Sequence, residues 1–164
     1  INFVIFNLGE KMKKIIFTII IMAFSYSKDS SLTISYSSGV LEFEESDYEA
    51  DYNTIGIKYS VHTGSSSEWG AYYDFDLEEG EINLVGASMR SYFQQDTFSP
   101  FLELNVGLAL ADDDNYLTIG GKLGGRYSIS DNNSVEIAFR YSYFETDYQE
   151  HYISSLVLGY SFPL

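Results

Sequence analysis

The chain has 164 residues, enough for one domain, and carries a net charge of −15. This charge argues against a nucleic-acid-binding protein, because neutralising phosphates requires Lys and Arg. The absence of Cys excludes a disulfide scaffold and any thiolate metal site. The chain contains 15 Tyr and 12 Phe but only 2 Pro, and together with Gly and Ser this composition favours strands and turns over helices.

The N-terminal part has the pattern of a secretory signal peptide. A basic stretch precedes an apolar run of ten residues, at Lys11, Lys13, Lys14 and then Ile15–Phe24. Small residues follow, so we expect cleavage after Ser25, or alternatively after Ser27, with Met12 as the true start. A permanent transmembrane helix is the weaker interpretation, because ten residues cover only about half of a bilayer. The expected organisation is a signal peptide with an upstream extension over residues 1–25 and a β-domain over residues 26–164.

From residue 31 onward, the sequence alternates with a period of two in eight segments separated by polar turns. The clearest segment sets one apolar face against one mixed face, with Leu102, Leu104, Val106, Leu108 and Leu110 alternating with Glu103, Asn105, Gly107 and Ala109. The expected strands lie near residues 31–43, 54–62, 69–77, 81–94, 102–110, 117–127, 135–143 and 151–162. The register of the first, fourth and last segments is the least clear.

The two faces of these segments predict which side meets lipid. One face is broad, apolar and aromatic, whereas the other holds Gly, Ser and isolated charges, which suits a narrow lumen. Segments of about ten residues can cross the hydrocarbon layer when tilted, and an open sheet edge cannot lie in lipid. We therefore expect an all-β, eight-stranded antiparallel up-and-down transmembrane barrel in the outer membrane of a Gram-negative bacterium, with a periplasmic N-terminus. The alternative is a soluble barrel of the lipocalin kind, in which the large apolar side chains point inward and the charged ones face water.

Acidic residues gather in alternate connections between the segments. Sixteen of the 24 Asp and Glu residues lie within 42–51, 76–81, 112–114 and 145–150. In an up-and-down barrel these four connections share one end, which we expect to be extracellular, while shorter turns occupy the other end.

The basic residues of the predicted barrel all lie on its lumen face, at Lys58, Arg90, Lys122, Arg126 and Arg140. Hairpin geometry places Arg90 opposite Glu103, Glu103 opposite Arg126 and Arg126 opposite Glu136. The same geometry places Lys58 opposite Asp74. We expect a ladder of charge pairs along the lumen wall, because unpaired charges there are costly. An eight-stranded interior is filled by side chains, so this ladder argues against an open pore.

The C-terminal part resembles the small outer-membrane β-barrel family, which includes the OmpA transmembrane domain, OmpX-like proteins and the opacity adhesins. The resemblance rests on the motifs Pro100–Ala109, Gly124–Asn132, Phe139–Ser142 and Leu158–Phe162. It covers about 40% of the chain, from Pro100 to Phe162, and supports fold and location without fixing an activity. The resemblance implies that the terminal aromatic residue, Phe162, is part of the signal read by the outer-membrane assembly machinery.

Three functions remain open from the sequence. The favoured one is a non-enzymatic surface barrel, structural or adhesive through its acidic outer loops. Its expected partners are outer-membrane lipid, lipopolysaccharide, the assembly machinery and possible host or matrix surface molecules. A small diffusion channel is the main alternative, since the lumen glycines Gly56, Gly107, Gly120 and Gly124 leave room for water.

A lipid-modifying enzyme is the least favoured function. His62 and His151 are the only histidines, and both are expected to lie at the surface. Ser155 is about four residues, or some 13 Å, from His151 along a strand, too far for a hydrogen bond. Asp112–Asp114 lacks the spacing of a calcium-binding EF-hand loop. We expect no catalytic residue, no metal site and no cofactor.

Overall fold

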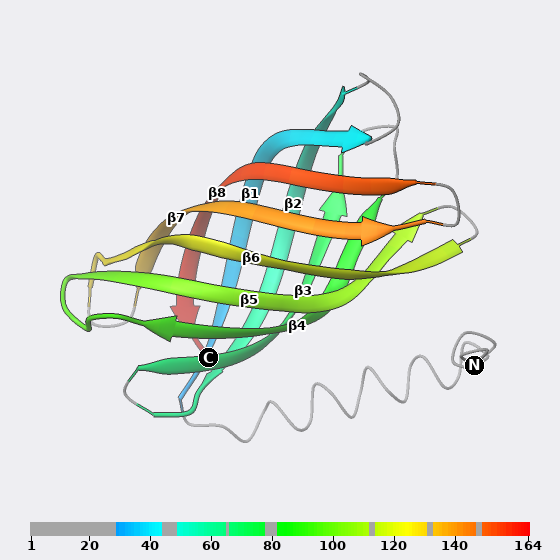
Figure 1. The fold of residues 1–164 in the computed structure, drawn as a ribbon. Coiled ribbons are helices and arrows are strands. Elements are labelled where there is room, and N and C mark those ends of the chain that lie inside the picture. Colours follow the sequence, from blue (N-terminus) through cyan, green and yellow to red (C-terminus); the bar gives the residue numbers. More distant parts are fainter. Residues whose placement is uncertain are drawn as a thin grey trace.

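The computed structural model describes residues 29–43, 49–64, 66–77, 82–111, 114–130, 133–146 and 149–164. These residues form eight strands: β1 (Ser30–Phe43), β2 (Glu49–His62), β3 (Ser67–Asp76), β4 (Asn83–Tyr92), β5 (Phe98–Ala111), β6 (Asp114–Ser128), β7 (Ser134–Glu145) and β8 (Glu150–Pro163). Each strand pairs antiparallel with its neighbours in sequence, and Figure 1 shows the resulting tilted barrel. The predicted fold class is confirmed.

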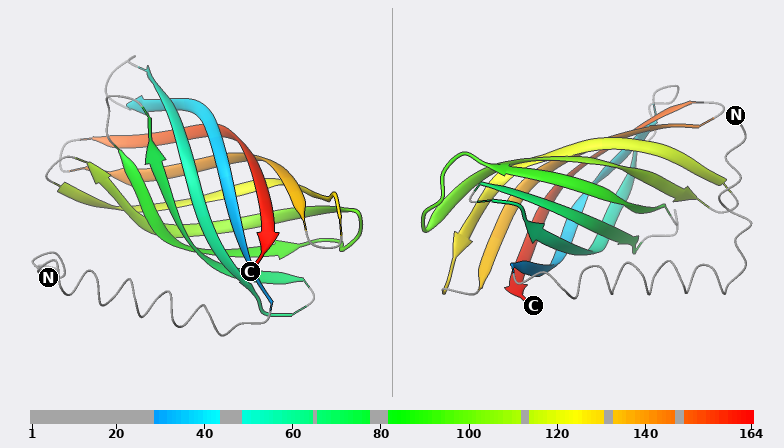
Figure 2. Two further views of the ribbon diagram at one scale, coloured as in Figure 1. Left: turned by 180° about the vertical axis from the view of Figure 1, so that it is seen from behind. Right: turned by 90° about the horizontal axis from the view of Figure 1, so that it is seen from below.

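The first and last strands close the barrel. Their pairing runs from Ser31 opposite Pro163 to Phe43 opposite His151, so the sheet has no free edge. The start of β1 and the end of β8 lie together at one end, which Figure 2 shows from two further sides. We call this the terminal end, and we call the opposite end, which holds the acidic connections, the loop end. The expected signal peptide and its cleavage site lie outside the described residues.

The barrel turns its apolar residues outward. Leu117 is 71% exposed, and Trp69 and Phe139 are 54% and 55% exposed. The charged side chains of Arg90 and Glu103 are 1% and 0% exposed. A soluble barrel requires the reverse facing, so the lipocalin-like alternative does not fit this chain. The described residues contain no helix long and apolar enough to cross a membrane.

The pairing registers confirm some hairpin expectations and correct others. Arg90 lies opposite Glu103, and Arg126 lies opposite Glu136, as expected. The expected pairing of Glu103 with Arg126 is wrong, because β5 and β6 pair as far as Ala111 opposite Asp114. Their turn is therefore centred earlier than Asp114, and Glu103 lies opposite Lys122 instead.

The second hairpin also closes earlier than expected. The amide of Thr63 donates to the carbonyl of Ser67 over 3.0 Å, which sets the register of β2 against β3. Asp74 consequently lies opposite Gly56, and Lys58 lies opposite Tyr72. The expected pairing of Lys58 with Asp74 is therefore wrong.

Candidate functional site

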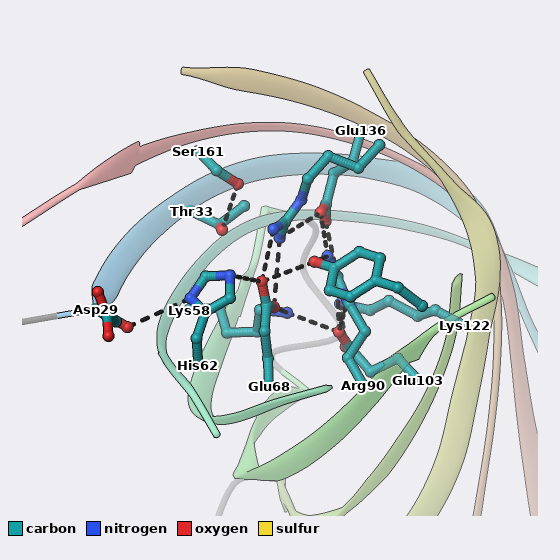
Figure 3. Close-up of polar contacts among 12 residues, drawn as sticks. Asp29, Thr33, Lys58, His62, Glu68, Arg90, Glu103, Lys122, Glu136 and Ser161 are labelled. Carbon is teal, nitrogen blue, oxygen red and sulfur yellow. Dashed lines mark hydrogen bonds and ion pairs between the residues drawn. The ribbon is translucent and has the colours of Figure 1, made fainter. Parts of the chain in front are cut away.

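The lumen near the terminal end holds a network of charged side chains from six of the strands, which we call the lumen network: Lys58, Glu68, Arg90, Glu103, Lys122, Arg126 and Glu136. Glu103 lies at its centre. Its Oε2 is 2.6 Å from both Lys58 Nζ and an Arg90 guanidinium nitrogen, and its Oε1 is 3.3 Å from Lys122 Nζ. One fully buried carboxylate thus compensates three cations from three strands (Figure 3).

The network crosses the lumen instead of following its wall. The guanidinium of Arg90, on β4, donates to both oxygens of Glu136, on β7, over 2.6 and 3.2 Å. Arg126 lies 3.7 Å from the same carboxylate. The guanidinium of Arg90 also stacks 3.8 Å from the centroid of the Phe101 ring. The four expected ladder residues therefore meet, but Arg90 and not Arg126 joins the two glutamates.

Glu68 is a network member that the sequence reasoning missed. Arg126 Nη1 donates to its Oε1 over 2.6 Å, and the hydroxyl of Tyr92 donates to the same atom over 2.7 Å. His62 Nε2 lies 3.0 Å from that oxygen, at the mouth of the barrel. Glu68 precedes Trp69, where the expected third segment began, so its place on the lumen face of β3 was not considered. Extending the alternation by one residue would have identified it.

A separate ion pair lies further toward the loop end. Arg140 Nη1 is 2.5 Å from Asp74 Oδ2, and both side chains are buried. Arg140 also donates to the hydroxyls of Ser37, over 2.9 Å, and Ser155, over 3.1 Å. This pair joins β7 to β3 through the middle of the lumen. Asp74 is thus paired with a cation, but not with the expected Lys58.

The loop end of the lumen is filled by apolar side chains, which the sequence reasoning did not foresee. Its buried members, which we call the apolar cluster, are Leu41, Tyr52, Tyr72, Ile82, Leu84, Ala109, Phe144 and Ile153. Tyr52, Leu84, Phe144 and Ile153 are each at most 1% exposed. The lumen is therefore closed by charge pairs near one end and by close-packed apolar side chains near the other.

The two histidines differ in environment. His151 is buried against the apolar cluster, so its expected surface position is wrong. Its ring stacks on Phe144 with centroids 4.7 Å apart and packs edge-on against Phe43 at 5.0 Å. Its Nε2 lies 3.3 Å from the hydroxyl of Thr146, a half-buried residue just after β7. His62 is partly exposed, with its side chain 36% accessible.

Glycines in the lumen are contact points and not open space. A Cβ on Gly56 would lie 2.3 Å from Asp74 Oδ1, and one on Gly107 would lie 2.1 Å from the Val85 carbonyl oxygen. A Cβ on Gly124 would overlap Ala138 at 2.6 Å, and one on Gly120 would meet the Ser142 hydroxyl at 2.6 Å. The expected room for water at these four glycines is thus taken by neighbouring strands. Among the described residues, no group of three or more His, Asp or Glu side chains could hold a metal ion.

Comparisons with known proteins agree with this architecture. No protein-family model matches the sequence, and no curated protein matches it. Among solved structures, Neisserial surface protein A (NspA) matches with a TM-score of 0.68 at 15% identity, over 82% of this chain and 97% of that one. Ail, the attachment invasion locus protein of Yersinia pestis, matches with a TM-score of 0.57 at 14% identity, over 83% of this chain and 99% of Ail.

Two further findings mark the range of this fold. Ail has also been solved in complex with the heparin analogue sucrose octasulfate. The outer membrane enzyme PagL matches with a TM-score of 0.51 at 18% identity, over 80% of this chain and 99% of PagL. At these identities the likeness concerns the fold alone. The chain has the eight-stranded transmembrane barrel fold that NspA and Ail share.

Proposed function

We propose that the protein is a non-enzymatic surface barrel of the Gram-negative outer membrane, with a closed lumen and a partner-binding surface at its loop end. The observation that carries this proposal is the double closure of the lumen, by the lumen network and by the apolar cluster. A diffusion channel needs a continuous water path, and both layers oppose one. The buried His151, stacked on Phe144, likewise disfavours hydrolytic chemistry.

The outward apolar face supports the membrane location. Exposed large apolar side chains occur on every strand except β4, including Ile34, Trp69 and Leu158, and such a surface is stable only against lipid. The N-terminus then lies in the periplasm if the longer, acidic connections face outward, as is usual for bacterial barrels. Phe162 lies in β8 beside β1, and we propose that it serves in recognition by the assembly machinery.

The charge of the loop end indicates the kind of partner. The described strand ends at this rim carry solvent-accessible acidic side chains beside three of the four connections, at Glu42, Glu49, Asp51, Asp114, Glu145 and Glu150, whereas Asp76, beside the fourth, is buried. This surface would repel a sulfated polyanion such as the analogue bound to Ail. It suits cationic segments of surface or matrix proteins, or lipopolysaccharide phosphates bridged by divalent cations.

Binding of whole cells tests the surface role. Cells that display the protein would be compared with cells that display the variant Glu44→Gln, Glu45→Gln, Asp47→Asn, in adhesion to immobilised basic matrix protein. We expect the variant to lose most of the protein-dependent adhesion, and more so at low salt because exposed charges are screened at high salt. The matched control is Asp29→Asn with Asp96→Asn at the terminal end, which should adhere as the original does. Equal adhesion of all three proteins would contradict the proposed role of the acidic loop end.

A further inference from the structure

A groove runs along the outward face of the barrel over β6, between β5 and β7, which flank β6 in the sheet (Figure 1). It has a volume of about 370 Å³, and its walls are mainly apolar and aromatic side chains: Leu102, Leu104, Ile119, Leu123, Phe139 and Tyr141. A second hollow continues it toward the loop end and shares Ile119 and Tyr143 with it. This hollow ends at Glu145 and Thr146, so the groove reaches from the barrel wall to the loop-end rim.

Gly121 forms the floor of the groove. It lies opposite Leu104 on β5 and Tyr141 on β7, two side chains that point outward. A Cβ on Gly121 would lie 2.9 Å from the carbonyl oxygen of Glu103 and 3.8 Å from Leu104 Cδ2, and no further atom of the described residues beyond its chain neighbours would lie within 4 Å. The ring of Tyr141 instead packs near Tyr152 on β8, with centroids 6.0 Å apart. The floor is therefore uncovered between its two walls.

Gly125, which also faces outward on β6, shows how the chain closes a similar notch. A Cβ on Gly125 would lie 2.3 Å from the ring of Phe98, which covers this glycine from β5. Phe98 stands two residues before Pro100, the partner of Gly125 in the sheet. Leu102 stands in the same position relative to Gly121, but none of its atoms lies within 4 Å of a Cβ there. The chain thus fills one notch itself and leaves the other to a molecule from outside.

The groove continues the surface that contacts lipid. Its walls belong to the outward apolar face, with Leu123 and Phe139 61% and 55% exposed. From Leu117 to Leu123 the strand rises about 20 Å. At a tilt of about 45° this covers about 14 Å of depth, close to half of the ~30 Å hydrocarbon core. The groove therefore matches the acyl chains of one leaflet, the leaflet at the loop end.

The rim of the groove favours a sugar headgroup over a phosphodiester. Glu145 is exposed there, and its carboxylate accepts a hydrogen bond from the Tyr143 hydroxyl over 3.3 Å. Glu150 lies opposite it on β8 and adds a second carboxylate. An ionised carboxylate only accepts hydrogen bonds, so it suits sugar hydroxyls, which can donate, and repels a phosphodiester, which cannot.

We propose that this groove binds one acyl chain of a glycolipid from the leaflet at the loop end. The chain lies over Gly121, between the wall of Leu102 and Leu104 and the wall of Phe139, where it takes the place that the Phe98 ring has over Gly125. The inference rests on the membrane location in the proposed function, and it is independent of the adhesive role of the acidic loop end.

Quenching of tryptophan fluorescence in vesicles tests this site. Trp69, the single tryptophan, is replaced by Phe, and a new one is placed on the groove wall by Tyr141→Trp or elsewhere on the outward face by Tyr73→Trp. Both proteins are folded in vesicles of brominated phosphatidylcholine, which quenches tryptophan on contact, and deep-rough lipopolysaccharide is added stepwise.

We expect lipopolysaccharide to relieve the quenching of the groove tryptophan at a mole fraction about threefold lower than for the tryptophan on β3, because a chain in the groove gains packing contacts on both sides. Equal relief in the two proteins, or earlier relief on β3, would overturn the proposal, since the groove would then hold phospholipid at least as well as glycolipid.

Leu102→Phe locates the binding, because it places a ring beside Gly121 in the position that Phe98 has beside Gly125. Added to the Tyr141→Trp protein, it should abolish the threefold preference. Ile57→Phe, on the outward face of β2 and 52% exposed in the original protein, is the matched control and should keep the preference. A preference that survives Leu102→Phe in protein shown by gel mobility to be folded would contradict this site. The adhesion assay tests the acidic loop end separately, so either proposal can fail without the other.

Discussion

Replacing Glu103 by glutamine removes the central negative charge of the lumen network while keeping the size of the side chain. Arg90 would retain Glu136 at 2.6 Å, and Lys58 would retain only Glu68, at 4.0 Å. Lys122 has no other ion pair with a described carboxylate. The net charge of the network would rise from one to two. Removing one partner of a buried charge pair costs about 3–5 kcal/mol, and we expect a loss of unfolding free energy in this range.

The measurement is reversible urea unfolding of the protein in lipid vesicles, followed by tryptophan fluorescence. Trp69 is the single tryptophan of the chain and lies on the outward face, so its emission reports loss of the lipid environment. Glu49→Gln, at an exposed position on the loop-end rim, is the matched control and should change the free energy by at most about 0.5 kcal/mol.

A second substitution tests whether the loss comes from unpaired charge. The double variant Glu103→Gln with Lys122→Met removes the cation that Glu103→Gln leaves without a partner. We expect it to recover about 1–2 kcal/mol relative to Glu103→Gln alone, a coupling typical of residues in one network. If Glu103→Gln unfolds within about 1 kcal/mol of the original protein, or if the double variant shows no recovery, the reasoning from buried pairing is refuted.

Three further changes test other parts of the structure. Phe144→Ala in the apolar cluster should lower the unfolding free energy by about 3–5 kcal/mol in the same urea assay, and a change under about 1 kcal/mol would contradict close packing at the loop end. Arg140→Met should destabilise the barrel because it leaves Asp74 buried without its cation. The double variant Arg140→Met with Asp74→Leu should be more stable than Arg140→Met alone, and a double variant less stable than the single one would refute the pairing. Phe162→Ala should reduce the amount of heat-modifiable, assembled protein in the outer membrane without changing refolding of the purified chain, and normal assembly would remove its proposed role.

The strand pattern and much of the lumen could be predicted because they follow from local rules. Alternation alone identified the strands, and hairpin symmetry placed Arg90 opposite Glu103 and Arg126 opposite Glu136 correctly. The same rule failed at Glu103 and Arg126 because it depends on the centre of each turn. An error of one or two residues at a turn moves every pair of that hairpin.

The contacts across the lumen could not be predicted from the sequence. The bond between Arg90 and Glu136 joins β4 to β7, and it depends on closure of the whole barrel and on the reach of a long side chain. The apolar cluster was missed for a different reason. Leu41, Leu84 and Ile153 interrupt the polar face of their strands and look like irregular alternation until the barrel brings them together.

Single-channel conductance of the folded protein in a planar bilayer tests the closed lumen most directly. The lumen network and the apolar cluster form two separate closures, so we expect no stable conductance from protein shown by gel mobility to be folded and inserted. The Phe144→Ala variant should also show no stable conductance, because the lumen network still closes the other end. A steady, reproducible conductance from the original protein would contradict the closed lumen and would favour a diffusion channel.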